Sequence, residues 1–158
     1  ARRFAAEMKA GRIEELGRLM NISHDGDRVI SIAADGSERP YRAPTSNDYI
    51  RSLIDDLESG NLDRAKRAQL QWQPGSYHCS LPEIDRMVHI SRQTKGVVGA
   101  QLAGAGLGGC MMVLAHRDAV SNLVANLTQH YYQPHAKAPT ILVCRPVAGC
   151  DVLMRNAW

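Results

Sequence analysis

Apolar residues recur at helical spacing at the start of the chain. The positions are Phe4, Met8, Ile13, Leu16 and Met20. Residues three or four positions apart share one face of a helix, and a glycine at position 11 separates the two groups. The pattern therefore predicts two short helices that break at this glycine, with apolar faces that cover a sheet.

The next stretch of the chain combines turns with polar helices. Val29–Ile32 predicts a short strand within a segment rich in Asp, Gly and Pro. Asn47 is suited to cap an amphipathic helix, and a second, basic helix is predicted to reach Trp72. We expect residues 32–75 to be an insertion on a smaller core.

The second half of the chain carries the element order that decides the fold class. In chain order, the predicted elements are a strand at Tyr77–Cys79, a helix that includes Ile84 and Val88, strands at Val97–Ala103 and Cys110–Ala115, a helix from Val120 to Tyr131, and a strand at Thr140–Val143. This β-α-β-β-α-β order is the split βαβ, or ferredoxin-like, arrangement. We therefore predict an α+β fold with this core, additional N-terminal helices and a helical insertion.

The first helix of that core has the clearest predicted start and end. Ser80-Leu81-Pro82-Glu83 matches a capping box with an early proline. Gly96 stands where a glycine commonly reverses the chain after a helix. Asp85, close to this start, is predicted to be a solvent-facing or helix-terminal carboxylate.

The composition argues against several classes of protein. The chain has 158 residues, 44% of them hydrophobic, which is enough for one domain. It has no long apolar run and no secretory leader pattern, so we expect a cytoplasmic protein without a membrane partner. A net charge of +3 and a single Phe argue against a nucleic-acid partner. The chain starts at Ala1, inside a helical pattern, and we expect it to be a fragment.

The cysteines and histidines do not predict a metal site. The four cysteines are widely separated and form no C-x-x-C pair, so neither a disulfide framework nor a zinc site is predicted. The histidines show no spacing typical of metal ligands. Cys110, at the start of an apolar strand, is predicted to be a small core residue.

A glycine-rich loop lies between the two longest predicted strands. Its residues are Gly104, Ala105, Gly106, Leu107, Gly108 and Gly109. Glycines allow positive φ angles and a close approach of the backbone to a ligand, and successive amides form a concavity that suits phosphate. A tight turn without a ligand explains the glycines equally well. The loop is not a P-loop or a dinucleotide-binding fingerprint, because a strand follows it instead of a helix.

Three segments carry a resemblance to a known family. Residues 99–110, GAQLAGAGLGGC, resemble the third conserved motif of the GHMP kinases, and within that family the galactokinases are the most similar. Residues 16–24, LGRLMNISH, resemble the galactokinase Gly-x-Leu-Met-x-x-Ser-His segment. Residues 79–85 resemble the Ser-x-Pro-Glu-Leu-Asp helix start, and residues 145–149 resemble the terminal Pro-x-x-Gly segment.

The chain also departs from the galactokinase pattern. Galactokinases commonly carry Arg and Thr at the positions of Gln101 and Ala103, and often Gly and Phe at those of Ala105 and Leu107. These departures leave the backbone chemistry of the loop in place. They put the identity of the sugar in question.

The resemblance implies a C-terminal domain that works with an N-terminal domain of the same protein. It implies ATP and Mg²⁺ as cofactors, a monosaccharide as substrate, and residues 104–109 as the phosphate-facing loop. The main phosphate loop and the catalytic Asp belong to the N-terminal domain in this family, so no catalytic residue is assigned here and Mg²⁺ is held mainly by that domain. Ser23, His24 and Gln101 are expected near the site or the domain interface, in supporting roles. The resemblance is also compatible with a supporting role for Asp85. This chain alone is expected to be inactive.

Other functions are compatible with the same residues. A galactokinase-like sensor binds nucleotide and sugar without useful turnover. A related GHMP kinase phosphorylates a different small alcohol. The module can also serve association alone, in which case the glycine loop has no ligand.

Overall fold

The computed structural model describes residues 2–145. The N-terminal part contains α1 (Arg2–Lys9) and α2 (Ile13–Asp27), followed by a hairpin of β1 (Ile30–Ile32) and β2 (Glu38–Pro40). Gly11, with a φ of 68°, lies between the two helices. The predicted helix pair with its glycine break is therefore confirmed.

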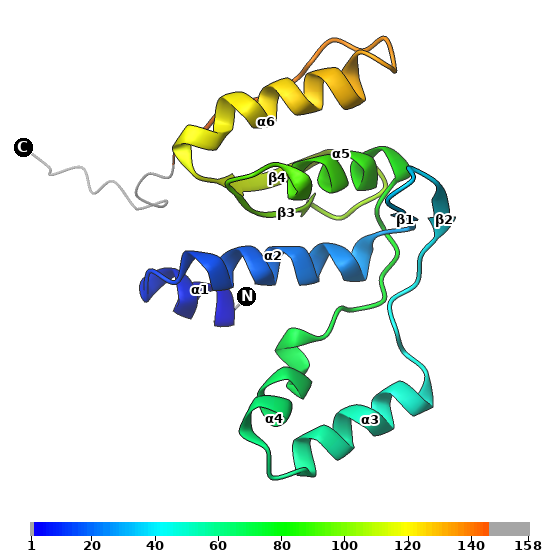
Figure 1. Cartoon of the computed structure of the whole chain (residues 1–158), viewed down its shortest axis with the longest axis vertical. Coiled ribbons are helices and arrows are strands. Elements are labelled where there is room, and N and C mark those ends of the chain that lie inside the picture. The colour runs from blue at the N-terminus through cyan, green and yellow to red at the C-terminus, as the bar shows by residue number, and fades with distance from the viewer. Residues whose placement is uncertain (1, 146–158) are drawn as a thin grey trace, which may run out of the picture.

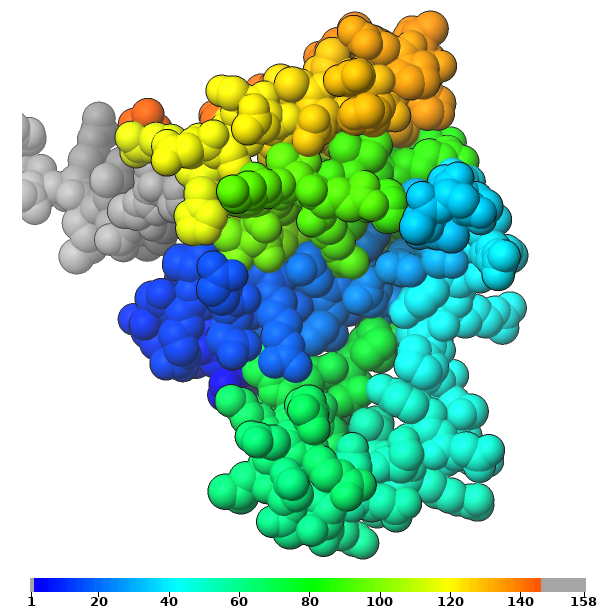
Figure 2. All heavy atoms as spheres, in the orientation of Figure 1, coloured from blue at the N-terminus to red at the C-terminus, as the bar shows by residue number. Residues whose placement is uncertain are grey.

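Two helices and a short 3-10 turn follow the first hairpin. They are α3 (Asn47–Glu58), α4 (Leu62–Ala68) and the turn Leu70–Trp72. Ser46, and not Asn47, caps α3, because its hydroxyl accepts a hydrogen bond from the amide of Tyr49. Figures 1 and 2 show this pair of helices as a lobe that projects from the rest of the molecule.

The core consists of α5 (Pro82–Gln93), β3 (Val97–Ala103), β4 (Cys110–Ala115) and α6 (Val120–Leu127), which continues as a π-helical turn through Tyr132. The strands β3 and β4 form an antiparallel hairpin in which Ala103 pairs with Cys110. Figure 1 shows this hairpin and α5 between α6 and α2. The bounds of both strands agree with the prediction.

Buried apolar side chains of α5 and β3 form the centre of the core. The cluster consists of Ile84, Val88, Ala100 and Leu102. Alternate residues of β3 point toward α5, as expected for a half-buried strand. Helix α5 is therefore held on the hairpin by its own apolar stripe.

Helix α2 covers the open edge of β3. The side-chain oxygen of Asn21 accepts the amide of Ala100 at 3.0 Å, and Nδ1 of His24 accepts the amide of Leu102 at 3.2 Å. An unpaired strand edge exposes amides that must find acceptors. The two side chains of α2 replace the neighbouring strand at this edge.

A close backbone approach makes that arrangement possible. A Cβ on Gly17 would lie 2.2 Å from the carbonyl oxygen of Val98, and a Cβ on Gly99 would lie 2.5 Å from the carbonyl oxygen of Gly17. Such distances are sterically forbidden. The glycine pair therefore sets the distance between α2 and β3.

The predicted outer strands of the core are wrong within the described residues. Tyr77–Cys79 is not a strand, because the amides of Tyr77 and His78 donate to the carbonyl of Gly26 at the end of α2, and His78 has a φ of 50°. Thr140–Val143 is not a strand either, and Leu142 is 88% exposed. An α+β fold with two small antiparallel sheets is confirmed, and the complete split βαβ order is not.

The predicted capping box is also wrong. Leu81 is the N-cap of α5, and no side chain caps it. Pro82 begins the helix, as predicted. The hydroxyl of Ser80 donates to Asp85 instead of accepting a backbone amide.

Between residues 2 and 145, no helix is long and apolar enough to cross a membrane.

Candidate functional site

The glycine loop, residues 104–109, is an exposed connection between β3 and β4. Gly104, Gly106, Gly108 and Gly109 have φ angles of 90°, 88°, 131° and 93°. These angles lie in the region that favours glycine. Leu107 also has a positive φ, 59°, and its side chain is 82% exposed. The loop therefore presents its backbone at the surface of this chain.

One contact fixes the tip of the glycine loop. The amide of Leu107 donates to the carbonyl oxygen of Cys79 at 2.6 Å. A Cβ on Gly106 would lie 2.2 Å from that same oxygen. Gly106 is therefore needed for both its φ and its contact, whereas a Cβ on Gly104 or Gly108 would meet nothing within 4 Å.

Cys79 connects the loop to α2. Its thiol donates to the carboxylate of Asp27 at 3.4 Å, and burial, together with this carboxylate, raises the pKa of the thiol. A thiol with a raised pKa stays protonated at neutral pH and keeps its donor. The next residue, Ser80, donates from its amide to the carbonyl of Asp27.

A buried polar network lies directly behind this segment. Oδ1 of Asp85 accepts the hydroxyl of Ser80 at 2.6 Å and lies 3.2 Å from Nε2 of His24. Its Oδ2 accepts the amides of Val29 and Ile30 at 2.8 and 2.9 Å. Both oxygens of Asp85 therefore accept hydrogen bonds. Of the two predicted positions, the helix-terminal one is correct, since Asp85 lies in the first turn of α5, and the solvent-facing one is wrong, because the residue is only 4% exposed.

The hydrogen bonds decide the ionisation of Asp85. Burial alone would raise the pKa of its carboxyl, but the hydrogen bonds from His24, Ser80 and the amides of Ile30 and Val29 outweigh burial and lower the pKa. Asp85 is thus a carboxylate at neutral pH. Its charge holds α2, β1 and α5 together.

The structure separates the other predicted site residues from one another. His24 belongs to the buried network, whereas Ser23 is exposed on α2. Gln101 is half-buried and alternates with Ala100 and Leu102, so it lies on the face of the hairpin away from α5.

Cys110 is exposed, and the prediction of a core cysteine is wrong because Cys110 lies at the loop end of the hairpin. Of the predicted terminal match, residues 146–149 lie outside the described residues.

The sequence reasoning missed four contributors to this region. They are Asn21, Ser80, Asp85 and Arg92. Asn21, Ser80 and Asp85 fall inside the segments that resemble galactokinases, and this resemblance is the feature of the sequence that could have indicated their roles. Arg92 had no such feature.

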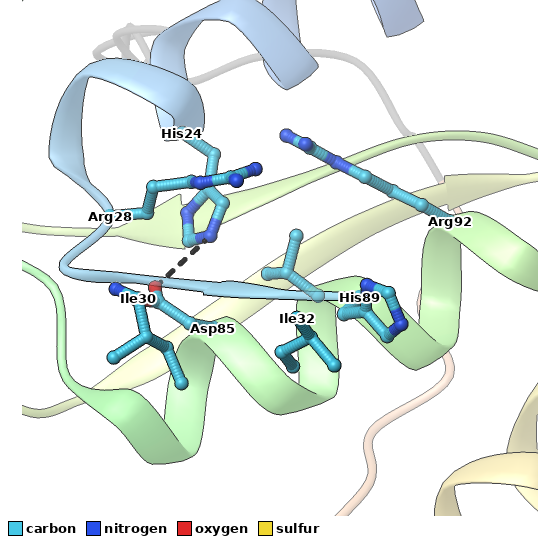
Figure 3. A pocket seen from close by; sticks show the side chains of 8 residues that line it. His24, Arg28, Ile30, Ile32, Asp85, His89 and Arg92 are labelled. Carbon is cyan, nitrogen blue, oxygen red and sulfur yellow. Dashed lines mark hydrogen bonds and ion pairs between the residues drawn. The ribbon is translucent and has the colours of Figure 1, made fainter. Parts of the chain in front are cut away.

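Two hollows of the described surface lie away from the glycine loop. The first is lined by residues of α2, β1 and α5, including His24 and Asp85 (Figure 3). The second, of ≈ 520 Å³, lies between the turn of the first hairpin, α5 and α6. Residues 104–109 line neither of these two hollows.

The loop suits a phosphate ligand in its chemistry. It has four glycines with positive φ, of which two are exposed and two are half-buried, and a series of backbone amides in such a loop attracts an anion without a basic side chain. A nucleotide phosphate fits this donor set. The loop holds no carboxylate that would bind Mg²⁺.

Several galactokinases are similar to this chain. It is 31% identical over 153 residues to "Galactokinase" of Roseiflexus sp. (strain RS-1), a match that covers 97% of this chain and 27% of that protein. It is 31% identical over 156 residues to "Galactokinase" of Streptococcus suis (strain 05ZYH33), covering 91% of this chain and 40% of that protein. The chain thus spans between about a quarter and two fifths of these curated relatives.

A family comparison covers the middle of the chain. Residues 50–133 match the model of the GHMP kinases C terminal. The match includes α5, the glycine loop and α6. The resemblance found in the sequence is confirmed, and this chain belongs to the C-terminal domain family of the GHMP kinases.

Proposed function

We propose that this chain is the C-terminal domain of an ATP-dependent, galactokinase-like sugar kinase that transfers the γ-phosphate of ATP to a hydroxyl of a monosaccharide. The exposed glycine loop carries the proposal, because four of its residues are glycines with positive φ angles and its tip is hydrogen-bonded to the carbonyl of Cys79, just before α5. The similarity to proteins named galactokinase supports the choice of reaction.

In this proposal the glycine loop forms one wall of the nucleotide cleft. Backbone amides of the glycine loop other than that of Leu107 donate hydrogen bonds to phosphate oxygens, while the Leu107 amide keeps the loop on Cys79. Phosphoryl transfer depends on positioning and on charge stabilisation, so a fixed wall contributes geometry without a catalytic side chain. When bound, Mg²⁺ neutralises charge on the nucleotide, and it is held mainly by the N-terminal domain of the protein.

The domain boundaries belong to the same proposal. Residues 1–158 form one C-terminal domain in a cytoplasmic protein, and residues 32–75 are an insertion within it. The central α5-β3-β4-α6 order matches the inner elements of a ferredoxin-like arrangement, and the two predicted outer strands are not present among the described residues. Ser23 and Gln101 are proposed to face the domain interface.

A panel of monosaccharides tests the reaction. The full-length protein is incubated with each sugar and ATP-Mg, and ADP release is followed together with the position of the new phosphate. Turnover of at least one sugar is expected. Nucleotide binding without turnover of any sugar would favour the sensor, and turnover of a non-sugar alcohol would favour a different GHMP kinase.

A matched pair of glycine variants tests the role of the loop. Gly106→Ala places a Cβ against Cys79 and strains the backbone, so we expect at least a tenfold loss in kcat/KM for ATP, or about 1.4 kcal/mol. Gly36→Ala carries the same backbone strain at a φ of 82° in the first hairpin turn, where a Cβ meets nothing within 4 Å. Equal kinetics in both variants would show that the loop only turns the chain.

A further inference from the structure

The cavity between the end of α2 and the middle of α5 is lined by two arginines. It has a volume of ≈ 90 Å³, and Arg28 and Arg92 line it together with His24, Asp85 and His89 (Figure 3). Ile30, Ile32 and Val88 form the apolar part of its wall. Figure 3 shows the two guanidinium groups converging above the ring of His24.

The carboxylates near this cavity already have hydrogen-bond and ion-pair partners. Oδ1 of Asp25 accepts from Nη1 of Arg28 at 3.2 Å and from Nη1 of Arg92 at 2.8 Å, so one carboxylate serves two cations. Asp85 uses both oxygens for Ser80, His24 and two backbone amides. The histidine next to it adds no charge, because Nδ1 of His24 accepts the amide of Leu102 and the ring is therefore neutral.

Donors remain on both arginines. Within residues 2–145, the Nε groups of Arg28 and Arg92 are buried and have no hydrogen-bond partner. A buried donor without an acceptor costs about 1–3 kcal/mol. The two guanidinium groups lie at the same cavity, so one small ligand with several acceptor oxygens can reach both.

We propose that this cavity binds a small oxyanion of the phosphate or carboxylate class. Its volume of ≈ 90 Å³ suits one small anion of this kind. Arginine forms paired hydrogen bonds with these anions. The site is separate from the glycine loop, which lines no part of the cavity, and the inference does not depend on the proposed kinase activity.

His89 lines this cavity and also the second hollow, so its ring reports an anion in either place, and the Arg28 variants show which of the two is occupied. Burial lowers the pKa of the His89 ring, as do the charges of Arg28 and Arg92. The other charged group on the cavity wall is Asp85. An anion between the arginines offsets their charge, so we expect the pKa of His89 to rise when the anion binds.

The test follows the His89 ring by nuclear magnetic resonance in the full-length protein at constant ionic strength. Inorganic phosphate and acetate are titrated separately, which distinguishes the two anion classes. We expect a saturable shift of the His89 signals with at least one of them at millimolar concentration. The absence of a saturable shift with both anions would overturn the proposal.

Two variants of Arg28 test the site, and one variant of Arg86 is the control. Arg28→Gln is expected to weaken the response of His89 at least tenfold, and Arg28→Lys, which keeps the charge but loses donors, at least threefold. Arg86→Gln alters an arginine of the same helix that pairs with Glu38 and does not line the cavity, so its response should equal that of the wild type. An unchanged response in a folded Arg28→Lys protein, checked by its thermal unfolding, would also overturn the proposal.

Discussion

Helices α3 and α5 have the same length and similar amphipathic patterns, but they are packed very differently. Ile84 and Val88 of α5 are 3% and 1% exposed, whereas Ile50 and Ile54 of α3 are 47% and 46% exposed. The first pair lies on β3, and α3 has no buried residue. An apolar stripe therefore predicts a helix, but what covers the stripe depends on the tertiary structure.

The largest expected effect separates these two helices directly. Ile84→Ala removes buried methyl groups from the core and should lower the free energy of unfolding by about 4 kcal/mol. Ile54→Ala, the same change on the lobe, should cost less than about 1 kcal/mol, since half of that side chain is already in water. Chemical denaturation of both variants measures the difference. Equal losses would mean that the lobe is part of the core.

The second comparison sets a buried carboxylate against an exposed one. Asp85→Asn removes the charge that accepts four hydrogen bonds, and we expect a loss of about 3 kcal/mol at neutral pH. Asp48→Asn, on α3, alters a carboxylate in a loose ion pair with Arg51 and should change stability little.

The pH dependence of the Asp85 effect has a definite sign. The pKa of Asp85 is lowered in the folded state, so its contribution is present above the unfolded pKa and is lost as the pH falls through the folded pKa. The difference between wild type and Asp85→Asn should therefore shrink below about pH 4. A stability difference that stays constant at more acidic pH would contradict the conclusion that Asp85 is ionised in the folded state.

A third, smaller effect on stability compares a glycine in a close backbone contact with a glycine that has free space around it. Gly17→Ala forces α2 away from β3 and should cost about 2 kcal/mol by overpacking. Gly60→Ala, between α3 and α4, meets no atom within 4 Å and adds only the strain of a positive φ, about 1 kcal/mol. Thermal unfolding compares the two variants. A larger loss for Gly60→Ala would mean that the α2–β3 contact can relax.

The smallest effect tests the attachment of the lobe. Trp72 is buried, and the guanidinium of Arg18 in α2 lies 4.1 Å from the centre of its ring. Arg18→Met should cost about 0.5–1 kcal/mol through the lost cation–π contact. Faster hydrogen exchange of α4 amides, with unchanged exchange in α5, would place the loss at the lobe. A uniform increase would place it elsewhere.

The elements that sequence predicted well are those with a continuous local pattern. The bounds of β3 and β4 follow from apolar runs on either side of the glycine loop, and Pro82 marks the start of α5. Tyr77–Cys79 has residues typical of a strand, but its amides bind the end of α2, a partner some 50 positions away in sequence. No local pattern contains that information.

In the candidate site, too, features with a local sequence pattern were predicted and features that depend on distant contacts were not. The glycine loop was identified from composition, since positive φ angles require glycine. The buried role of Asp85 was missed, because a carboxylate near a helix start is most often exposed. Its partners on α2 and β1 become visible only when these elements are brought together.

The ring of His24 restricts which residues can replace it. One nitrogen accepts from β3 and the other faces a carboxylate of α5, so the ring must keep a single tautomer. A substitute needs an acceptor at one end and a donor at the other. Asn meets that polarity with a shorter reach, whereas Phe fills the volume, leaves the amide of Leu102 without its acceptor and removes one of the four donors to Asp85. Selection from a randomised library at this codon should therefore return histidine first and amide side chains next, with aromatic hydrocarbons absent.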